Sequence, residues 1–424
     1  MDITSTPPSP RHSRTGSPFS GWKVVLVCCV VQNLAMGFAL GSFGPLLAST
    51  EQHFGVTRSV ATTGMSLVML AAGGLSPFIG GLLQRVSVRN AMVGGALLSA
   101  VGYWGLAMLS SFSLALVMFG LIGVGLCVMG ILGPLTLISR WFATDRAKVL
   151  SVVNLPIAAF VTPFVVAKLL PEYGRLAILG SIGTIFLLVI PLLALIVDDP
   201  ARLGQAPHGA DRDSGGVIAM DAPFSVRQIL SSAPFWLLSL AMGAWAGAGI
   251  AFVVHIVPFG MERHMALQSA SGLLSLYAGA GIGGTLLFGW IADRIGPSAA
   301  LALSCFCQAL LWWGLLQVTG LPLFMMAALM GICVTPATTL HGAALSQLVG
   351  PASISRAMGV SYAIKLPFIF TFPPFVGHLF DLSGGYRLPF LLIASILTVS
   401  CLFFVLMIFA VRQPDKLLRA TAIG

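Results

Sequence analysis

A single lysine lies inside the apolar stretch SYAIKLPFIFTFPP (residues 361–374), surrounded by aromatic, aliphatic and proline residues. An ammonium in such surroundings can bind a carboxylate, because it carries a full charge and three hydrogen-bond donors. All 13 Asp and Glu residues fall in tails, in loops or at the ends of apolar runs. We therefore expect Lys365 to bind an anionic ligand. The alternative is a lysine whose stem reaches toward water or whose ammonium donates to a backbone carbonyl.

Other polar side chains within the apolar runs are candidates to contact the same ligand. Asn154 lies two residues before Pro156, just as Lys365 lies two residues before Pro367. The remaining candidates are Gln32, Asn33, Tyr362 and His255. Each could instead pack or bond to a neighbouring helix, as buried amides often do in membranes. If a proton moves with the ligand, the carrier would be His255, His341, deprotonated Lys365 or the ligand itself, because the apolar runs contain no acid at mid-depth.

Several kinds of chemistry are excluded by the pattern. The seven cysteines all lie inside apolar runs, and no spacing suggests a disulfide framework or a metal site. GAGIGG (279–284) fits a dinucleotide-binding pattern, but it lies in an apolar helix with no strand before it. No phosphate-binding loop and no catalytic constellation are visible. We expect no cofactor, no metal and no enzymatic activity.

The composition indicates a membrane protein. Of the 424 residues 57% are hydrophobic and only 8% are charged, and apolar runs of membrane-spanning length recur along the chain. Helices are the spans that fit such runs. The predicted spans are 22–45, 59–83, 90–110, 112–138, 147–169, 175–197, 233–258, 267–291, 298–318, 321–347, 356–380 and 387–411.

Matching stretches in the two halves predict an internal repeat. RAKVLSVVNLPIAAFVTPF (146–164) and RAMGVSYAIKLPFIFTFPPF (356–375) each carry two prolines seven residues apart inside a helix. GGLLQRVSVRNAM (80–92) and FGWIADRIGPSAA (288–300) follow equivalent helices. The expected fold class is an all-α membrane protein with twelve transmembrane helices in two pseudo-symmetric six-helix bundles. The interior prolines, Pro156 and Pro367 among them, would bend helices used for gating.

The polar segments set the predicted domain boundaries. Residues 1–20 form a disordered cytoplasmic tail, 21–197 the N-terminal bundle, 198–232 a cytoplasmic linker, 233–411 the C-terminal bundle and 412–424 a second tail. Sixteen of the 22 Lys and Arg residues fall on the side of the termini, five on the other side, and Lys365 lies between. This asymmetry predicts that both termini are cytoplasmic. It also accounts for the net charge of +9 without nucleic acid.

The loop motif and several other stretches resemble the major facilitator superfamily. GWIADRIG (289–296) matches the family's loop motif, and GLLQRVSV (81–88) matches it in part, with Gln84 in place of the acid. Within that family the chain resembles bacterial carriers akin to monocarboxylate transporters and oxalate/formate exchangers. The supporting stretches are GWKVVL (21–26), FGVTRS (54–59), RWF (140–142) and YAIK (362–365).

The resemblance implies roles for individual residues. In the oxalate/formate branch a lysine in a stretch like YAIK contacts the anion, which assigns that role to Lys365. The branch also has an arginine on helix 8, but this chain has Thr285 near that place, which favours a monoanion over a dianion. Asp293 and Arg294 would form a charge latch between neighbouring helix ends, with Arg85 as the counterpart in the first half.

The sequence thus predicts a multi-pass secondary active transporter in the bacterial inner membrane. We expect it to act as a monomer within the lipid bilayer and to move a small, monocarboxylate-like anion, with a proton or a counter-anion as the open choices for a coupled ion. A carrier of the same fold for an aromatic acid, a vitamin or an exported antibiotic is the alternative. A substrate-sensing receptor built on a carrier fold is a more distant one.

Overall fold

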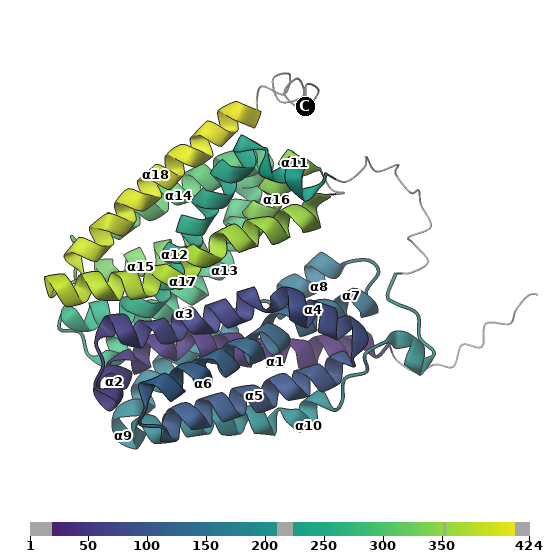
Figure 1. The fold of residues 1–424 in the computed structure, drawn as a ribbon, viewed down its shortest axis with the longest axis horizontal. Coiled ribbons are helices and arrows are strands. Elements are labelled where there is room, and N and C mark those ends of the chain that lie inside the picture. The colour runs from purple at the N-terminus through teal and green to yellow at the C-terminus, as the bar shows by residue number, and fades with distance from the viewer. Residues whose placement is uncertain (1–18, 210–223, 351–352, 412–424) are drawn as a thin grey trace, which may run out of the picture.

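The computed structural model describes residues 19–209, 224–350 and 353–411. Figure 1 shows two groups of helices, with α1–α10 in one and α12–α18 in the other. Of the predicted tails 1–20 and 412–424, all but residues 19 and 20 lie outside the described residues. The part of the linker at 210–223 also lies outside them.

The first group follows the six predicted spans, several of them divided into two elements. Its elements are α1 (Gly21–Gly41), α2 (Phe43–Phe54), α3 (Arg58–Gly74), α4 (Ser76–Arg85), α5 (Val88–Met108), α6 (Phe112–Gly125), the π-helix η1 (Leu126–Leu132), α7 (Gly133–Trp141), α8 (Arg146–Val153), α9 (Ile157–Leu188) and α10 (Ile190–Leu193). A short 3-10 helix, η2 (Pro200–Leu203), follows in the linker.

The second group has longer continuous helices. It begins with a short helix, α11 (Val226–Leu230), and its other elements are α12 (Ala233–Glu262), α13 (Leu267–Ile295), α14 (Pro297–Leu315), α15 (Leu321–Val334), α16 (Ala337–Val349), α17 (Ile354–Ser383) and α18 (Arg387–Val411). A capping box starts α11, in which Ser225 and Gln228 satisfy each other's backbone N–H groups.

The described helices account for twelve crossings of a membrane. Ten stretches are long and apolar enough, and the pair 58–74 and 76–85, bent by 46°, makes an eleventh. One of the ten, Lys148–Leu193, has 46 residues, which is about twice the roughly 20 that one crossing needs. Its chain reverses at Gly174, where φ is +74°, a conformation that glycine adopts without strain. The all-α membrane fold expected from the sequence is confirmed.

Some predicted helix ends are wrong. The first span was expected to end at residue 45, but after a break at Ser42 the chain continues as α2 to Phe54, where Gly55 ends it with φ +63°. The fourth span contains the π-helix η1 just before Pro134. Proline lacks the N–H of a regular helical bond, and Gly125 and Gly133 let this irregular turn pack closely against Ser99 and Met92.

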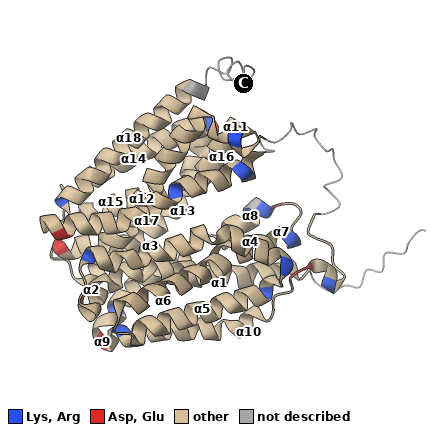
Figure 2. Cartoon of the chain, in the orientation of Figure 1, with Lys and Arg blue, Asp and Glu red and all other residues tan. Residues whose placement is uncertain are grey.

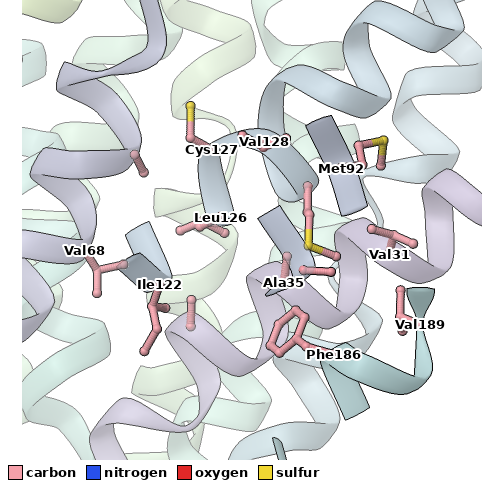
Figure 3. Close-up of a cluster of buried hydrophobic side chains, with 14 of the residues drawn as sticks. Val31, Ala35, Val68, Met92, Ile122, Leu126, Cys127, Val128, Phe186 and Val189 are labelled. Carbon is pink, nitrogen blue, oxygen red and sulfur yellow. The ribbon is translucent and has the colours of Figure 1, made fainter. Parts of the chain in front are cut away.

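The buried side chains form two apolar clusters, one for each group of helices. One is drawn from residues 24–196, together with Val254 of α12. Figure 3 shows part of it, including Val31 and Ala35 of α1 and Phe186 of α9. The other is drawn from residues 229–407. Large apolar side chains that are more than half exposed cover the outside, which suits contact with hydrocarbon; examples are Leu26, Val101, Leu188, Phe306 and Leu402.

The helix ends lie on two sides of the molecule. The ends at residues 85–88, 141–146, 295–297, 349–350 and 353–354 lie on one side. We call it the linker side, because the segments 198–209 and 224–232 lie there too. The far side holds residues 54–58, 108–112, 262–267, 315–321 and 383–387. Figure 2 shows that the charged residues gather near these ends, while most helix lengths carry none. Two hydrogen bonds attach the start of the linker segment 198–209 to the first group. The Asp198 carboxylate accepts from the backbone N–H of Arg89 in the first turn of α5, and the Trp141 indole N–H donates to Val197 O.

Candidate functional site

Lys365 lies within α17 and is buried, with 3% of its surface exposed. Its Nζ donates to Nδ1 of His341 on α16, at 3.2 Å. The same ammonium lies 3.6 Å from the centre of the Tyr362 ring, which is the arrangement of a cation–π contact. The charge is therefore surrounded by a neutral imidazole nitrogen and an aromatic face.

No acid neutralises Lys365 within the described part of the chain. The two ion pairs found there join Arg58 to Glu51 and Lys148 to Asp145. A charged side chain at the centre of a helix in the membrane costs at least about 2.5–3.5 kcal/mol on insertion scales. A neutral partner and a ring compensate for only part of that cost, so the site favours an added negative charge.

Tyr362, whose ring contacts Lys365, has an exposed side chain. Leu366, next along α17, packs on Gly73 of α3, where a Cβ would lie 3.2 Å from it. Tyr362 is four residues earlier, so it lies on the same face of the helix, one turn nearer the linker side. It is 43% exposed. The face of α17 that meets the first group at Leu366 is therefore uncovered at Tyr362, and Lys365 lies at that boundary.

Three of the other predicted residues come together in the first group of helices. Gln32 donates to the side-chain oxygen of Asn154. The side-chain oxygen of Asn33 accepts from the backbone N–H of Ala158 at 3.1 Å, and its amide donates to Cys29 O. These contacts stabilise the break between α8 and α9, where Pro156 interrupts the helical bonds. No hydrogen bond between described residues joins this cluster to Lys365.

The two equivalent prolines act differently. Pro156 precedes α9 with φ −82° and ψ 49°, so the helix stops and restarts there. Pro367 lies inside α17, which continues without a break from Ile354 to Ser383. The repeat seen in the sequence thus gives a broken helix in the first group and a continuous one in the second.

His255 lies closer to the far side of the molecule than Lys365 does. Both of its ring nitrogens form hydrogen bonds. Its Nε2 donates to Pro373 O, and its Nδ1 accepts from the Tyr386 hydroxyl, each at 2.9 Å. Arg58 donates to the same hydroxyl oxygen at 3.1 Å and pairs with Glu51 at 2.8 Å. His255 therefore belongs to a polar chain that connects the two groups of helices, which differs from the ligand-contacting place expected for it.

The two groups of helices meet through several contacts on the far side. The Arg58 guanidinium lies 4.0 Å from the centre of the Phe380 ring. Ser59 N donates to Asp381 Oδ2 at 3.0 Å. Deeper in the molecule, Gly279 of α13 faces the Phe160 ring, and Gly44 of α2 faces Val257 of α12. Together with Leu366 on Gly73, these contacts close the interface from the far side as far as Lys365.

The predicted latch residues are free of ion pairs. Asp293 and Arg294 are exposed at the linker-side end of α13, and the Arg294 guanidinium lies over the Trp290 ring, 3.8 Å from its centre. Arg85 is exposed at the end of α4. Neither ion pair of the described residues includes any of the three. The linker-side ends of the two groups are thus not joined by these charges in this structure.

His341, which the sequence offered only as one of several proton carriers, contacts Lys365 directly. It is fully buried, and its Nε2 lies 3.0 Å from Ser361 Oγ, which lies 2.9 Å from Ser239 Oγ. The sequence shows a histidine inside an apolar run. It does not show which face of α16 turns toward α17, so the contact could not be deduced from spacing.

The comparisons with known proteins agree with this architecture. The model of the family described as Major Facilitator Superfamily matches residues 29–321, which is more than half of the chain. The chain belongs to the Major Facilitator Superfamily. Its relatives and structural neighbours are transporters, so it is a secondary transporter of this class and not an enzyme.

Two relatives indicate the branch. Human monocarboxylate transporter 11 is 23% identical over 92% of this chain and 84% of its own length. The oxalate:formate antiporter of Oxalobacter formigenes is 22% identical over 64% of this chain and 62% of its own length. These names match the branch that the sequence resembles.

Solved structures share the fold. A bacterial homologue of the human lysosomal transporter Spinster, in an inward-facing and unoccupied conformation, covers 95% of this chain and 99% of its own, with a TM-score of 0.73 and 15% identity. A D-xylose-proton symporter covers 90% and 97%, with a TM-score of 0.67 and 14% identity. At these identities the likeness concerns the fold alone.

Proposed function

We propose that this transporter moves a small organic monoanion, of the monocarboxylate type, by alternating access. The observation that carries the proposal is the buried Lys365 ammonium, whose contacts in the structure are neutral. A carboxylate bound there would accept charge-assisted hydrogen bonds from it. Thr285, near the place of a second cation in the oxalate/formate branch, bonds to Gly281 O of its own helix. One cation suits one negative charge.

The arrangement of the two groups of helices supports a conformation of the carrier that is open toward the linker side. The far side is closed by Arg58, Ser59 and their partners, while Tyr362 is exposed on the linker side. In the opposite state the two groups would rock about the site, separating the far-side contacts and closing the linker side. Asp293, Arg294 and Arg85 would then pair across the linker side, and the break at Pro156 and the helix around Pro367 would accommodate the movement.

We also propose a membrane orientation and a domain organisation for the transporter. The excess of Lys and Arg supports a cytoplasmic location for the linker side and for both termini, with the protein in the plasma membrane of a bacterial-type cell. The two bundles are residues 21–197 and 233–411, joined by the linker 198–232, and the working unit is a monomer.

Counterflow in proteoliposomes tests the proposed substrate class. Vesicles loaded with unlabelled pyruvate, lactate, benzoate or oxalate are diluted into the same labelled anion at equal pH on both sides. We expect exchange of at least one monocarboxylate and at least about tenfold slower exchange of oxalate, because Lys365 is the one permanent cation that the described residues place in the site, and 1.4 kcal/mol already gives tenfold.

Empty vesicles and protein-free vesicles are the controls for leakage. Exchange of a neutral sugar or a cationic drug, unaffected by excess of any of the four anions, would contradict the proposal and favour a carrier of larger or neutral solutes. Retained binding of an anion without any flux would indicate a receptor.

Tyr362 provides a matched pair of variants. Tyr362→Phe keeps the ring over the Lys365 ammonium, whereas Tyr362→Ala removes it. A cation–π contact stabilises by about 0.5–2 kcal/mol, so we expect KM for the exchanged monocarboxylate to rise by roughly twofold to thirtyfold in the Ala variant and to stay near the original value in the Phe variant. Equal KM values for the two variants would show that the ring does not hold the cation.

A further inference from the structure

We propose that His341 is the proton-binding residue that couples anion movement through Lys365 to movement of one proton. The proposal rests on the proposed function and adds the coupled ion and the side chain that binds it. The geometry is a buried line of four polar groups, in which Lys365 Nζ, the His341 ring, Ser361 Oγ and Ser239 Oγ follow one another at 3.2, 3.0 and 2.9 Å.

The contacts fix the proton arrangement when the site is empty. The Lys365 ammonium can only donate, so Nδ1 of His341 must carry a free lone pair. The proton of the neutral ring is then on Nε2, which donates to Ser361 Oγ. The Ser361 oxygen also accepts a hydrogen bond from the Ser239 hydroxyl. This pair therefore shares one positive charge, and a second proton on Nδ1 would put two cations at hydrogen-bond distance.

Lys365 is the one charged side chain that the contacts of the described residues bring to the His341 ring. The elements packed against α16 are α12, α13, α14 and α17. α17 contributes Lys365, Ser361 and the Tyr362 ring, whose centre is 6.4 Å from that of the imidazole. α12 contributes Ser239 through Ser361. Within the described part of the chain, no hydrogen bond, ion pair or ring contact joins His341 or Lys365 to a carboxylate or to a side chain of α13 or α14.

A bound carboxylate changes this balance. Its oxygens accept the hydrogen bonds of the Lys365 ammonium, which frees the lone pair on Nδ1, and its negative charge compensates a second positive one. Nδ1 can then take a proton from water, so that one anion and one proton occupy the site together. When the anion leaves on the opposite side, its charge no longer compensates the Lys365 ammonium and the protonated His341. Nδ1 then releases its proton to the water on that side. The complete cycle moves one anion with one proton and no net charge.

Two assays on the full-length transporter separate coupling from binding. Pyruvate is the probe, because it is a strong enough acid to cross lipid slowly in its neutral form. Counterflow at equal pH measures exchange, and uptake into vesicles with an interior one pH unit more alkaline measures coupling. With the membrane potential clamped at zero, one-to-one coupling gives an accumulation ratio of about tenfold, since one pH unit is a tenfold proton ratio.

His341→Gln is the decisive variant. The glutamine oxygen can accept from Lys365 and its amide can donate to Ser361, but the side chain does not bind a proton near neutral pH. We expect counterflow to remain measurable and the accumulation ratio to fall to about one. His53→Gln is the matched control, because His53 is exposed on the far side and bonds to Leu109 O; its accumulation ratio should stay near tenfold.

A second measurement needs no variant. A pH-sensitive dye inside the vesicles should report acidification, with one proton for each pyruvate that enters the unaltered protein. Tenfold accumulation by a His341→Gln variant that exchanges pyruvate would overturn the proposal, as would pyruvate entry without acidification. Failure of the unaltered protein to exchange any monocarboxylate would instead contradict the proposed function, and the coupling proposal would fall with it.

Discussion

Replacing Lys365 by methionine is expected to lower counterflow of the transported monocarboxylate by about tenfold to a hundredfold or more. Hydrogen bonds to charged groups contribute about 1.5–3 kcal/mol each, and methionine fills a similar volume with no charge. His341 and Tyr362 would remain, but neither offers a cation to a carboxylate. Initial rates of labelled-anion exchange, normalised to the amount of inserted protein, measure the effect.

Lys168→Met is the matched control, because Lys168 is an exposed lysine on α9. Its counterflow should stay within about twofold of the unaltered protein. A Lys365→Met variant that inserts normally and exchanges the anion at an unchanged rate would show that the ammonium does not bind the substrate.

Replacing Arg58 by alanine is expected to open the far side. Arg58 is in the first group of helices, while Tyr386 and the Phe380 ring, both in contact with it, are in the second. Its loss removes a charge-assisted hydrogen bond and a cation–π contact, together about 2–5 kcal/mol. We expect the open population to rise at least about tenfold, and transport to slow because the far side no longer closes firmly.

Labelling of an introduced thiol measures the opening. Val257 is fully buried and faces Gly44 across the interface between the two groups. A membrane-impermeant maleimide should label Val257→Cys at least about tenfold faster in the Arg58→Ala protein, with the same protein lacking the added cysteine as background. Arg263→Ala is the control, because Arg263 donates to Leu316 O and Val318 O within its own group. Equal labelling rates for the Arg58 and Arg263 variants would contradict a closing role for Arg58.

The sequence was sufficient to predict the membrane fold and the central cation. Apolar runs of spanning length leave few alternatives to helices, because backbone groups in lipid must bond within the segment. Lys365 was identifiable because its charge contrasts with every residue around it. Its burial could also be predicted, because every other residue of the stretch 361–374 is uncharged.

The contacts between helices could not be predicted in the same way. His341 and His255 look alike in the sequence, each a lone histidine in an apolar run. The structure places His341 against Lys365 and His255 against Tyr386 and Pro373, because the rotation of each helix decides which residue it meets. Likewise Gln32 and Asn33 were expected to contact a ligand, but their described partners are Asn154 and the backbone around the break at Pro156.

The sequence predicted bends at the interior prolines, but it predicted none of the helix breaks. The continuation of the first span to Phe54 and the π-helix before Pro134 depend on close packing at Gly125 and Gly133, which a single sequence does not reveal. The equivalent prolines 156 and 367 differ for a related reason. Asn33 bonds to the free N–H of Ala158 and so supports an open turn beside Pro156, whereas α17 stays helical through Pro367.

Restoring the charge at position 365 is the most direct measurement. The Lys365→Cys variant should not exchange the monocarboxylate. Reaction of its thiol with aminoethyl methanethiosulfonate recreates an ammonium at nearly the length of lysine, whereas methyl methanethiosulfonate adds a neutral group of smaller size. We expect counterflow to return with the first reagent and to stay absent with the second, with no effect of either on the protein that keeps Lys365. Equal recovery with both reagents, or full exchange by the unmodified cysteine variant, would contradict the account.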